Sequence, residues 1–271
     1  MSLPFTARAL TLCLFALALE GCATSTAPGV VGAERRQLLL VSSEEMNAMA
    51  EQAYSELKTE ATRDGVLNTN ANHVQRVREI GQRIRPHTAV FREDAPNWNW
   101  EANVLQSDQL NAFCMPGGKI MFYSGIIEQL QLTDAEIAVI MGHEVAHALR
   151  EHSREQISQA LAAQAAIGIG AALLGVGQTG ADLANTGYGA LVATRFSRTD
   201  ETEADRIGLE LAARAGYDPS AGVTLWQKMM SANQGGRPPE ILSSHPAEAN
   251  RIREIEALLP TVMPLYTAAT R

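Results

Sequence analysis

The chain has 271 residues, of which 46% are hydrophobic, enough for one sizeable core in one domain or in one domain with appendages. The net charge of −8 argues against a nucleic-acid partner. Aromatic residues make up only 5%, whereas alanine, glycine and leucine dominate. This composition favours a mostly helical domain in which small side chains pack closely.

The N-terminal segment 1–21 has the features of a secretory signal rather than of a folded element. Its apolar run, 9–19, follows a short basic region and is too short to span a bilayer. The small residue before Cys22 resembles a bacterial lipobox, in which Cys22 is lipidated, although Glu20 departs from the usual pattern. Ordinary signal cleavage that leaves Cys22 free is the alternative. Because Ala23 follows, the resemblance implies sorting to the outer membrane of a Gram-negative bacterium, on its periplasmic side.

The segment after the predicted lipidation site has the composition of a linker. Residues 22–33 are mostly small, with serine, threonine, glycine and proline, so we expect a flexible tether between the lipid and a main domain at 34–271. Cys13 leaves with the signal and Cys22 is taken by lipid, so Cys114 is alone in the mature chain. No intramolecular disulfide is therefore expected.

The main domain begins with helical spacing over 34–86, in which Ser42 is a candidate N-cap. Short apolar segments at 98–106 and 110–125 follow, and the turn residues at 116–118 predict a hairpin in a small antiparallel sheet. The segment 133–136 then forms a capping-box pattern that opens one long helix. We therefore predict an α+β fold that is mainly α.

The second half of the domain is also predicted to be helical. Residues 165–190 are almost free of charge and rich in glycine and alanine, which favours a buried helical hairpin or, less simply, a hydrophobic flap. A helix begins near Arg198 and ends at Gly216, and the C-terminal segment 237–271 is helical too.

The long predicted helix contains His143-Glu144-Val145-Ala146-His147. Residues four apart lie on one helix face, so both imidazoles can reach one ion, and Glu144 can reach a water molecule beside that ion. This arrangement suits metal-assisted hydrolysis. The pattern alone is weak, because a helix with solvated His and Glu residues would show it as well, and a third ligand is the test.

Helix geometry narrows the search for that third ligand. The metzincin class needs Gly and His where this chain has Arg150 and Ser153, so that class is excluded. His152 lies nine residues after His143, which places it on the opposite face of a continuous helix. We therefore interpret His152 as a surface or core-edge histidine.

A second helix offers a carboxylate instead. Glu201 and Asp205 share a helix face, so Glu201 suits a ligand and Asp205 suits an acceptor for the free ring N–H of a ligand histidine. Glu203 points away from that face and is expected in solvent. Gly208 lies on the shared face, where a missing side chain lets two helices approach.

These blocks together resemble the HtpX and CAAX-prenyl-protease-type family of zinc metallopeptidases, the gluzincins. The resemblance covers roughly 40–260 and also includes 111–127 and the His-Pro segment 243–252. With the lipobox, it is nearest to a LoiP-like branch of periplasmic outer-membrane lipoproteins. It implies a zincin-like metalloprotease domain with one Zn²⁺ per chain.

The resemblance also implies roles for residues outside the two helices. The strand that contains Asn111, Ala112 and Phe113 is expected to bind substrate as an added strand, although an ordinary hairpin is the alternative. His245 is expected either to stabilise the oxyanion or to occupy the open position of the metal and keep the enzyme latent. Arg206 and Arg251 are candidates to pair with carboxylates of the site, although helix arginines are usually solvated.

We therefore predict a zinc-dependent endopeptidase, with Glu144 as general base, that degrades unfolded or misassembled envelope proteins in quality control. Expected partners are these substrates, the outer membrane and its assembly machinery. Two rival hypotheses stay open: a non-catalytic chaperone-like lipoprotein, which would not need Glu144, and a latent protease capped by His245 or by 165–190.

Overall fold

The computed structural model describes residues 22–173, 195–234, 240–245 and 250–271. Its helices are α2 (Ser43–Arg63), α3 (Ala71–Ile84), α4 (Ser124–Gln129), α5 (Asp134–Leu149), α6 (His152–Leu173), α8 (Arg198–Arg214), α9 (Ala221–Gln234), α10 (Ile241–Ser244) and α11 (Arg251–Ala269). Short 3₁₀ turns cover Arg85–Val90 and Ala95–Asn97. The strands are β1 (Cys22–Ala23), β2 (Gln37–Leu38), β3 (Glu101–Leu105), β4 (Ala112–Met115) and β5 (Lys119–Tyr123). The predicted α+β, mainly α class is confirmed, and none of the described helices is long and apolar enough to cross a membrane.

The sheet next to the long helices has the order β3-β5-β4. The predicted hairpin is present, because β4 pairs antiparallel with β5 across the left-handed turn residues Gly117 and Gly118. β3, however, pairs parallel with β5, with Ala102 opposite Ile120. The sheet is therefore mixed rather than wholly antiparallel. The sequence of the strand segments does not reveal that β5 lies between the other two strands. Because it lies there, β4 is at an edge of the sheet.

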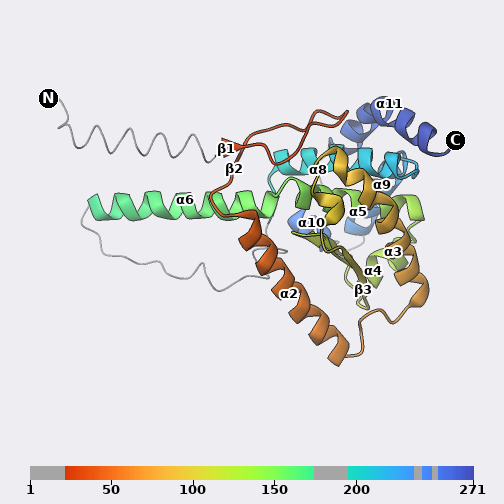
Figure 1. The fold of residues 1–271 in the computed structure, drawn as a ribbon. Helices are drawn as coiled ribbons and strands as arrows, with labels where there is room; N and C mark the ends of the chain where they lie inside the picture. The colour runs from red at the N-terminus through yellow and green to blue at the C-terminus, as the bar shows by residue number, and fades with distance from the viewer. Residues whose placement is uncertain (1–21, 174–194, 235–239, 246–249) are drawn as a thin grey trace.

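Helices α5 and α8 cross at the centre of the molecule (Figure 1). The predicted capping box is present, since Thr133 accepts from the backbone of Glu136 and Glu136 bonds back to Thr133. The two helices meet at glycines: an added Cβ on Gly208 would lie 2.6 Å from the backbone nitrogen of His143. An added Cβ on Gly142 would likewise be too close to the backbone of Gly208. The expected close approach at Gly208 is thus observed.

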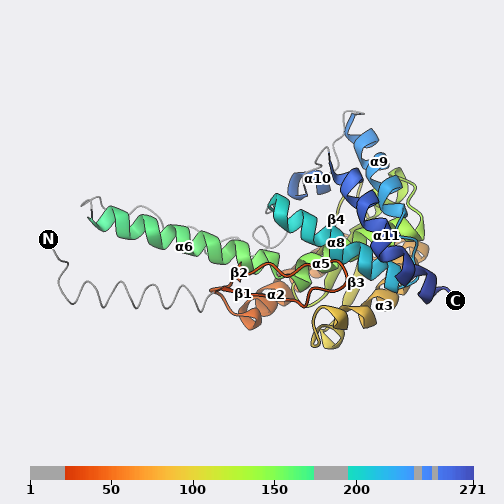
Figure 2. The same cartoon turned by 90° about the horizontal axis from the view of Figure 1, so that it is seen from above.

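The predicted long helix is broken. Helix α5 ends at Leu149, and Glu151 adopts a left-handed conformation with φ of 53° before α6 begins at His152. In both views α6 extends away from the other helices (Figures 1 and 2). The first residues of the predicted hairpin or flap, 165–173, continue α6, and 174–190 lie outside the described residues.

The predicted tether is not a free linker. We call residues 23–38 the strap; in Figure 1 it is drawn in red and runs across α8. Its backbone N–H groups bond to the domain, from Ala27 to the carbonyl of Phe91 (2.8 Å) and from Val30 to the carboxylate of Glu210 (2.9 Å). Through these bonds the backbone of the strap pairs with the domain instead of with water. The composition of the segment alone does not reveal this pairing. The predicted signal, 1–21, lies outside the described residues.

Candidate metal centre

Four side chains meet where α5, α8 and the end of α10 come together. His143, His147, Glu201 and His245 each offer a ligand atom, and these atoms all lie within 4.8 Å of one another. The carboxylate of Glu201 is 3.6 Å from Nε2 of His143 and 3.4 Å from Nε2 of His147. All four residues are buried. The two histidines four residues apart on α5 and the glutamate predicted from a second helix thus meet at one point.

Asp205 lies behind His143, one turn after Glu201 on α8. Its Oδ1 is 3.0 Å from Nδ1 of His143, close enough to accept a hydrogen bond from the ring. When Nδ1 carries the proton, the lone pair of Nε2 faces Glu201 and the other histidines. Burial alone would raise the pKa of Asp205, but the charges of Arg251 and His143 lower it, so the carboxylate form is favoured.

Arg251, at the start of α11, binds both carboxylates of α8. Its guanidinium donates to Glu201 (2.6 Å) and to Asp205 (2.6 and 2.7 Å), and it stacks over the ring of Trp226 at 3.8 Å. It is buried rather than solvated. Arg206, the other arginine singled out from the sequence, instead reaches a strap carbonyl 3.5 Å away.

His245 contacts two acidic groups of the centre. Its Nδ1 is 2.8 Å from Oε1 of Glu201, and its Nε2 is 3.5 Å from Oε1 of Glu144. Burial lowers the pKa of His245, but the two glutamates overcome this and raise it. The structure thus places His245 in contact with the acidic groups of the centre.

Glu144 differs from the other acids because its Oε1 is buried without a hydrogen-bond partner. Burial is the main cause of the raised pKa of Glu144. A buried carboxylate oxygen without a hydrogen bond is costly to keep unless a water molecule or an ion satisfies it. It lies on the same helix as the two α5 histidines, offset by one residue from His143.

Two residues that we expected near solvent are buried beside His147. His152 is fully buried, with Nδ1 2.9 Å from Nδ1 of His147 and Nε2 3.1 Å from Glu203. The prediction for His152 assumed a continuous helix, and the break at Glu151 turns it back toward the site. Glu203 is buried because the strap and Arg150 cover that side of α8.

Comparison with known proteins identifies the family of this chain. The model of peptidase family M48 matches residues 72–259, more than half of the chain, and this range includes His143, His147, Glu201 and His245. The chain belongs to peptidase family M48. Membership of this family supports a peptidase activity, and the branch within the family is a separate question.

Named relatives of this M48 peptidase come from bacteria and mitochondria. The mitochondrial metalloendopeptidase OMA1 of Schizosaccharomyces pombe is 35% identical over 83% of this chain and 64% of its own length. The metalloprotease LoiP of Escherichia coli is 28% identical over 89% of this chain and 91% of its own. The beta-barrel assembly-enhancing protease of E. coli is 29% identical over 66% of this chain and 37% of its own. The chain thus spans less than two thirds of the OMA1 and beta-barrel assembly-enhancing relatives.

The donor set of this M48 peptidase fits zinc. Imidazole nitrogens and a carboxylate oxygen are the ligands of catalytic zinc sites, and His143, His147 and Glu201 supply that set. Each of the two α5 histidines also has a partner for its other nitrogen, Asp205 or His152. The unpartnered oxygen of Glu144 completes the arrangement, since a water molecule held there would find its acceptor.

The M48 peptidase also has the predicted edge strand. The backbone N–H of Tyr123 donates to the carbonyl of Asn111, which identifies these two as a hydrogen-bonded pair. Because such pairs alternate in an antiparallel ladder, the backbone groups of Ala112 and Cys114 point to the open edge and those of Phe113 point to β5. The Asn111 side chain accepts from the N–H of Ala112 rather than pointing away.

Cys114 is not a candidate nucleophile. It is buried, and burial raises the pKa of its thiol well above the ordinary value.

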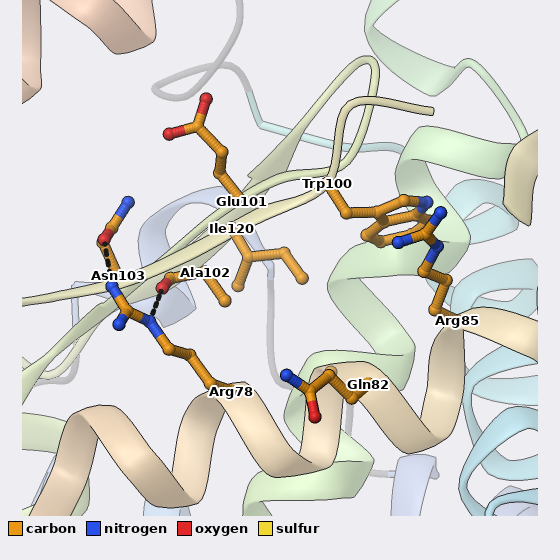
Figure 3. A pocket seen from close by; sticks show the side chains of 9 residues that line it. Arg78, Gln82, Arg85, Trp100, Glu101, Ala102, Asn103 and Ile120 are labelled. Carbon is orange, nitrogen blue, oxygen red and sulfur yellow. Dashed lines mark hydrogen bonds between the residues drawn. The ribbon is translucent and has the colours of Figure 1, made fainter. Parts of the chain in front are cut away.

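The described residues form two hollows that bear on where a substrate could bind. One, of about 340 Å³, lies between α3 and β3 and is lined by Arg78, Gln82 and Trp100 among others (Figure 3). Arg78 donates there to Ala102 and Asn103, and no residue of the metal centre takes part. The other touches His143, Glu144 and His245 but has only about 20 Å³, room for about one water molecule.

Proposed function

We propose that this chain is an endopeptidase in which His143, His147 and Glu201 hold one zinc ion and Glu144 is the general base. The observation that supports this most strongly is the convergence of the three ligand groups beside the buried carboxylate of Glu144, whose Oε1 makes no hydrogen bond. Asp205 orients His143. A pure binding protein would need neither Glu144 nor the two oriented imidazoles, so the chaperone-like hypothesis is the weaker one.

The chemistry follows from where each group lies. Zinc, when bound, lowers the pKa of a water molecule and polarises the peptide carbonyl. Glu144 accepts the proton of that water at its carboxylate and delivers it to the departing amine nitrogen. His245, 3.5 Å from Glu144, would offer a donor to a developing oxyanion when it is protonated.

The substrate is proposed to bind as an extended chain along β4. Ala112 and Cys114 offer outward backbone groups, and an added strand would pair with these regardless of its side chains. This binding mode requires an unfolded or locally extended substrate. Asn111 would have to release the N–H of Ala112 when the substrate pairs, and Phe113 would stay in the sheet.

The cellular setting is proposed from the N-terminal sequence and from the relatives' names. The lipobox-like segment ending at Cys22 supports a periplasmic lipoprotein on the outer membrane, in a LoiP-like branch. One relative is named for enhancing β-barrel assembly, which supports misassembled envelope proteins as substrates and the assembly machinery as a partner. The resemblance to the HtpX and CAAX-prenyl-protease-type family is proposed only as a more distant relationship than that to the LoiP-like branch.

A latent state is the second candidate, and specific contacts favour it. The N–H of Ile241 donates to the carbonyl of Leu110, and the N–H of Leu110 donates to Glu240, at the extension of the β4 edge. His245, four residues after Ile241, contacts Glu201. The hollow beside the metal centre has room for about one water. The segment 240–245 must therefore move before a peptide can enter.

The test combines metal content with proteolysis. Zinc per chain is measured, and cleavage of an unfolded protein is followed, for the wild-type chain without residues 1–22 and for Glu144→Gln. We expect one zinc in both, and cleavage reduced about 10²- to 10⁴-fold in the variant. Zinc without cleavage in either protein favours the latent state, in which case His245→Ala should restore activity. A chain that takes up no zinc when it is offered in excess would refute the proposal.

A further inference from the structure

His147 is held from behind by a pair of residues that the zinc chemistry itself does not use. Nδ1 of His152 lies 2.9 Å from Nδ1 of His147, and Nε2 of His152 lies 3.1 Å from Oε2 of Glu203. His152 is fully buried, and Glu203 is 6% exposed. Phe196 packs on the imidazole of His147 with ring centroids 4.0 Å apart, so the ring has no room for another partner on that face.

The chain of contacts determines which nitrogen of each ring carries a proton. Glu203 is an acceptor, so Nε2 of the neutral His152 ring must donate to it, and Nδ1 of His152 is then an acceptor. That acceptor takes the Nδ1–H of His147. The lone pair of His147 is thereby left on Nε2, the atom that faces Glu201 at 3.4 Å. Asp205 does the same for His143 in one step instead of two.

Glu203 is in turn held by two arginines. Arg150, fully buried at the end of α5, donates to both carboxylate oxygens (3.0 and 3.2 Å). Arg35 of the strap donates to them as well (3.1 and 3.3 Å). Burial raises the pKa of Glu203, but His152, Arg150 and Arg35 overcome this and lower it to about 2. Glu203 is therefore a carboxylate under ordinary conditions.

The strap seals this arrangement on the outside. Arg35 also binds Glu155 (2.6 Å) and Asp200 (2.8 Å). Gln37 donates to the carbonyl of Arg150 (2.7 Å), a group left without a helical partner by the end of α5. Because Arg35 touches three carboxylates, loss of the strap would remove the guanidinium that lies among them.

The cluster of His152, Asp200 and Glu203 is not a second metal site by these contacts. Its three ligand atoms lie close enough to hold an ion. Two guanidinium groups already neutralise the carboxylates, however, and the second nitrogen of His152 is engaged with His147. A cation there would have to displace Arg35 and Arg150.

We propose that His152 and Glu203, held in place by Arg35 of the strap, are positioning residues that keep His147 in the tautomer and orientation needed to bind zinc. The inference rests on the proposed role of His147 as a ligand. It gives the N-terminal segment a part in the active site: the segment that leads from the predicted lipid anchor also secures a metal ligand. Neither residue touches the reacting atoms.

The experiment measures zinc affinity of the full chain by competition with a chromophoric chelator. Glu203→Gln keeps the shape of the side chain but removes the charge, and Arg35→Met removes the strap's hold on Glu203. We expect affinity to fall about 10- to 100-fold in Glu203→Gln and by a smaller factor in Arg35→Met. Arg35→Lys, which restores the charge but not the forked geometry, should recover part of the loss.

Lys228→Met is the matched control. It also removes a cation from a buried glutamate of this helix pair, Glu136 on α5 (2.7 Å), but it lies at the other end of α5 from His147. We expect it to lower thermal stability and leave zinc affinity unchanged. An affinity loss as large in Lys228→Met as in Glu203→Gln would overturn the proposal, because the effect would then be general softening.

Further outcomes separate this proposal from the zinc site itself. If the wild-type chain binds one zinc tightly and a folded Glu203→Gln variant binds it equally well, the positioning role is refuted and the site stands. If the wild-type chain binds none, the zinc site fails first. Should Glu203→Gln not fold, the Arg35 variants decide, since Arg35 is 31% exposed and better tolerated: unchanged affinity in Arg35→Met would then refute the role of the strap.

Discussion

At the scale of single residues, the two ligand histidines face the same point but depend on unlike partners. His143 bonds directly to a carboxylate, Asp205, whereas His147 reaches its carboxylate through another imidazole, that of His152. Asp205 is also bound by Arg251, which holds Glu201 with the same guanidinium. Asp205 thus supports two of the three proposed ligands. Its replacement should therefore weaken the zinc site.

Asp205→Asn tests this expectation. The amide keeps an oxygen for His143 but loses the charge that pairs with Arg251, so zinc affinity should fall about 10- to 100-fold. Chelator competition gives the affinity, and thermal unfolding of the zinc-free protein gives the stability. Asp134→Asn is the control, because Asp134 begins α5 and pairs with Arg76 at the surface. Equal zinc affinity in Asp205→Asn and wild type would contradict the orienting role.

At the scale of elements, the site depends on how closely α5 and α8 approach. Gly208→Ala would bring a Cβ to 2.6 Å from the backbone nitrogen of His143 and to 2.8 Å from the carbonyl carbon of Gly142. The backbone atoms of α5 cannot rotate away as a side chain could, so the two helices must separate. We expect the unfolding free energy to fall by about 1–3 kcal/mol. Zinc affinity should fall with it, because Glu201 and His143 lie on the two separated helices. Urea unfolding and chelator competition measure both.

A matched glycine on another helix provides the control. Gly81 of α3 would place its new Cβ 3.5 Å from the sulfur of Met141, an ordinary contact. Alanine also forms helix better than glycine by about 1 kcal/mol, so Gly81→Ala should be neutral or stabilising. Destabilisation of equal size in both variants would show that the α5–α8 contact is not special.

Elements with local signals were predictable from the sequence, and those that depend on distant contacts were not. The capping boxes at Ser42 and Thr133 place helix starts correctly, because each bond joins residues three apart. The break after α5 has no glycine or proline to announce it: Glu151 adopts a left-handed conformation, and its carboxylate is engaged by Arg154. The place of β5 in the sheet is likewise decided by pairing across the chain.

The same distinction holds within the site. The proposed zinc ligands and Asp205 could be found from residues four apart on two predicted helices, together with the resemblance to a known family. The positions of His152 and Glu203 depend on the helix break and on the strap, whose residues 25–37 lie more than 100 positions before them. A linker-like composition gave no sign that Arg35 would be drawn onto three acids. Uncompensated acidic residues on a predicted helix, such as those of 200–205, are the signal that an arginine from elsewhere is needed.

At the scale of the whole molecule, ion pairs join the strap to the domain. These pairs need deprotonated carboxylates and therefore weaken at low pH. Burial raises the pKa of Glu155, but the bonds from Arg35 and Gln37 lower it overall, below the ordinary value of 4.5. In the unfolded chain Glu155 would take up a proton near 4.5, and in the folded chain only at lower pH. The folded protein therefore loses stability as pH falls below 4.5, since the unfolded state binds the extra proton.

Glu155→Gln isolates that contribution. The variant should be less stable than wild type near pH 7, because Arg35 and Gln37 lose a charged acceptor, and the difference should shrink as pH falls through the range where wild-type Glu155 gains its proton. Urea midpoints from about pH 7 to about pH 3, measured with a chelator present, exclude zinc release as the cause. Other acids and the buried histidines titrate in both proteins, so only the difference between the two curves bears on Glu155. A constant difference across that range would mean that the strap is held without the charge of Glu155.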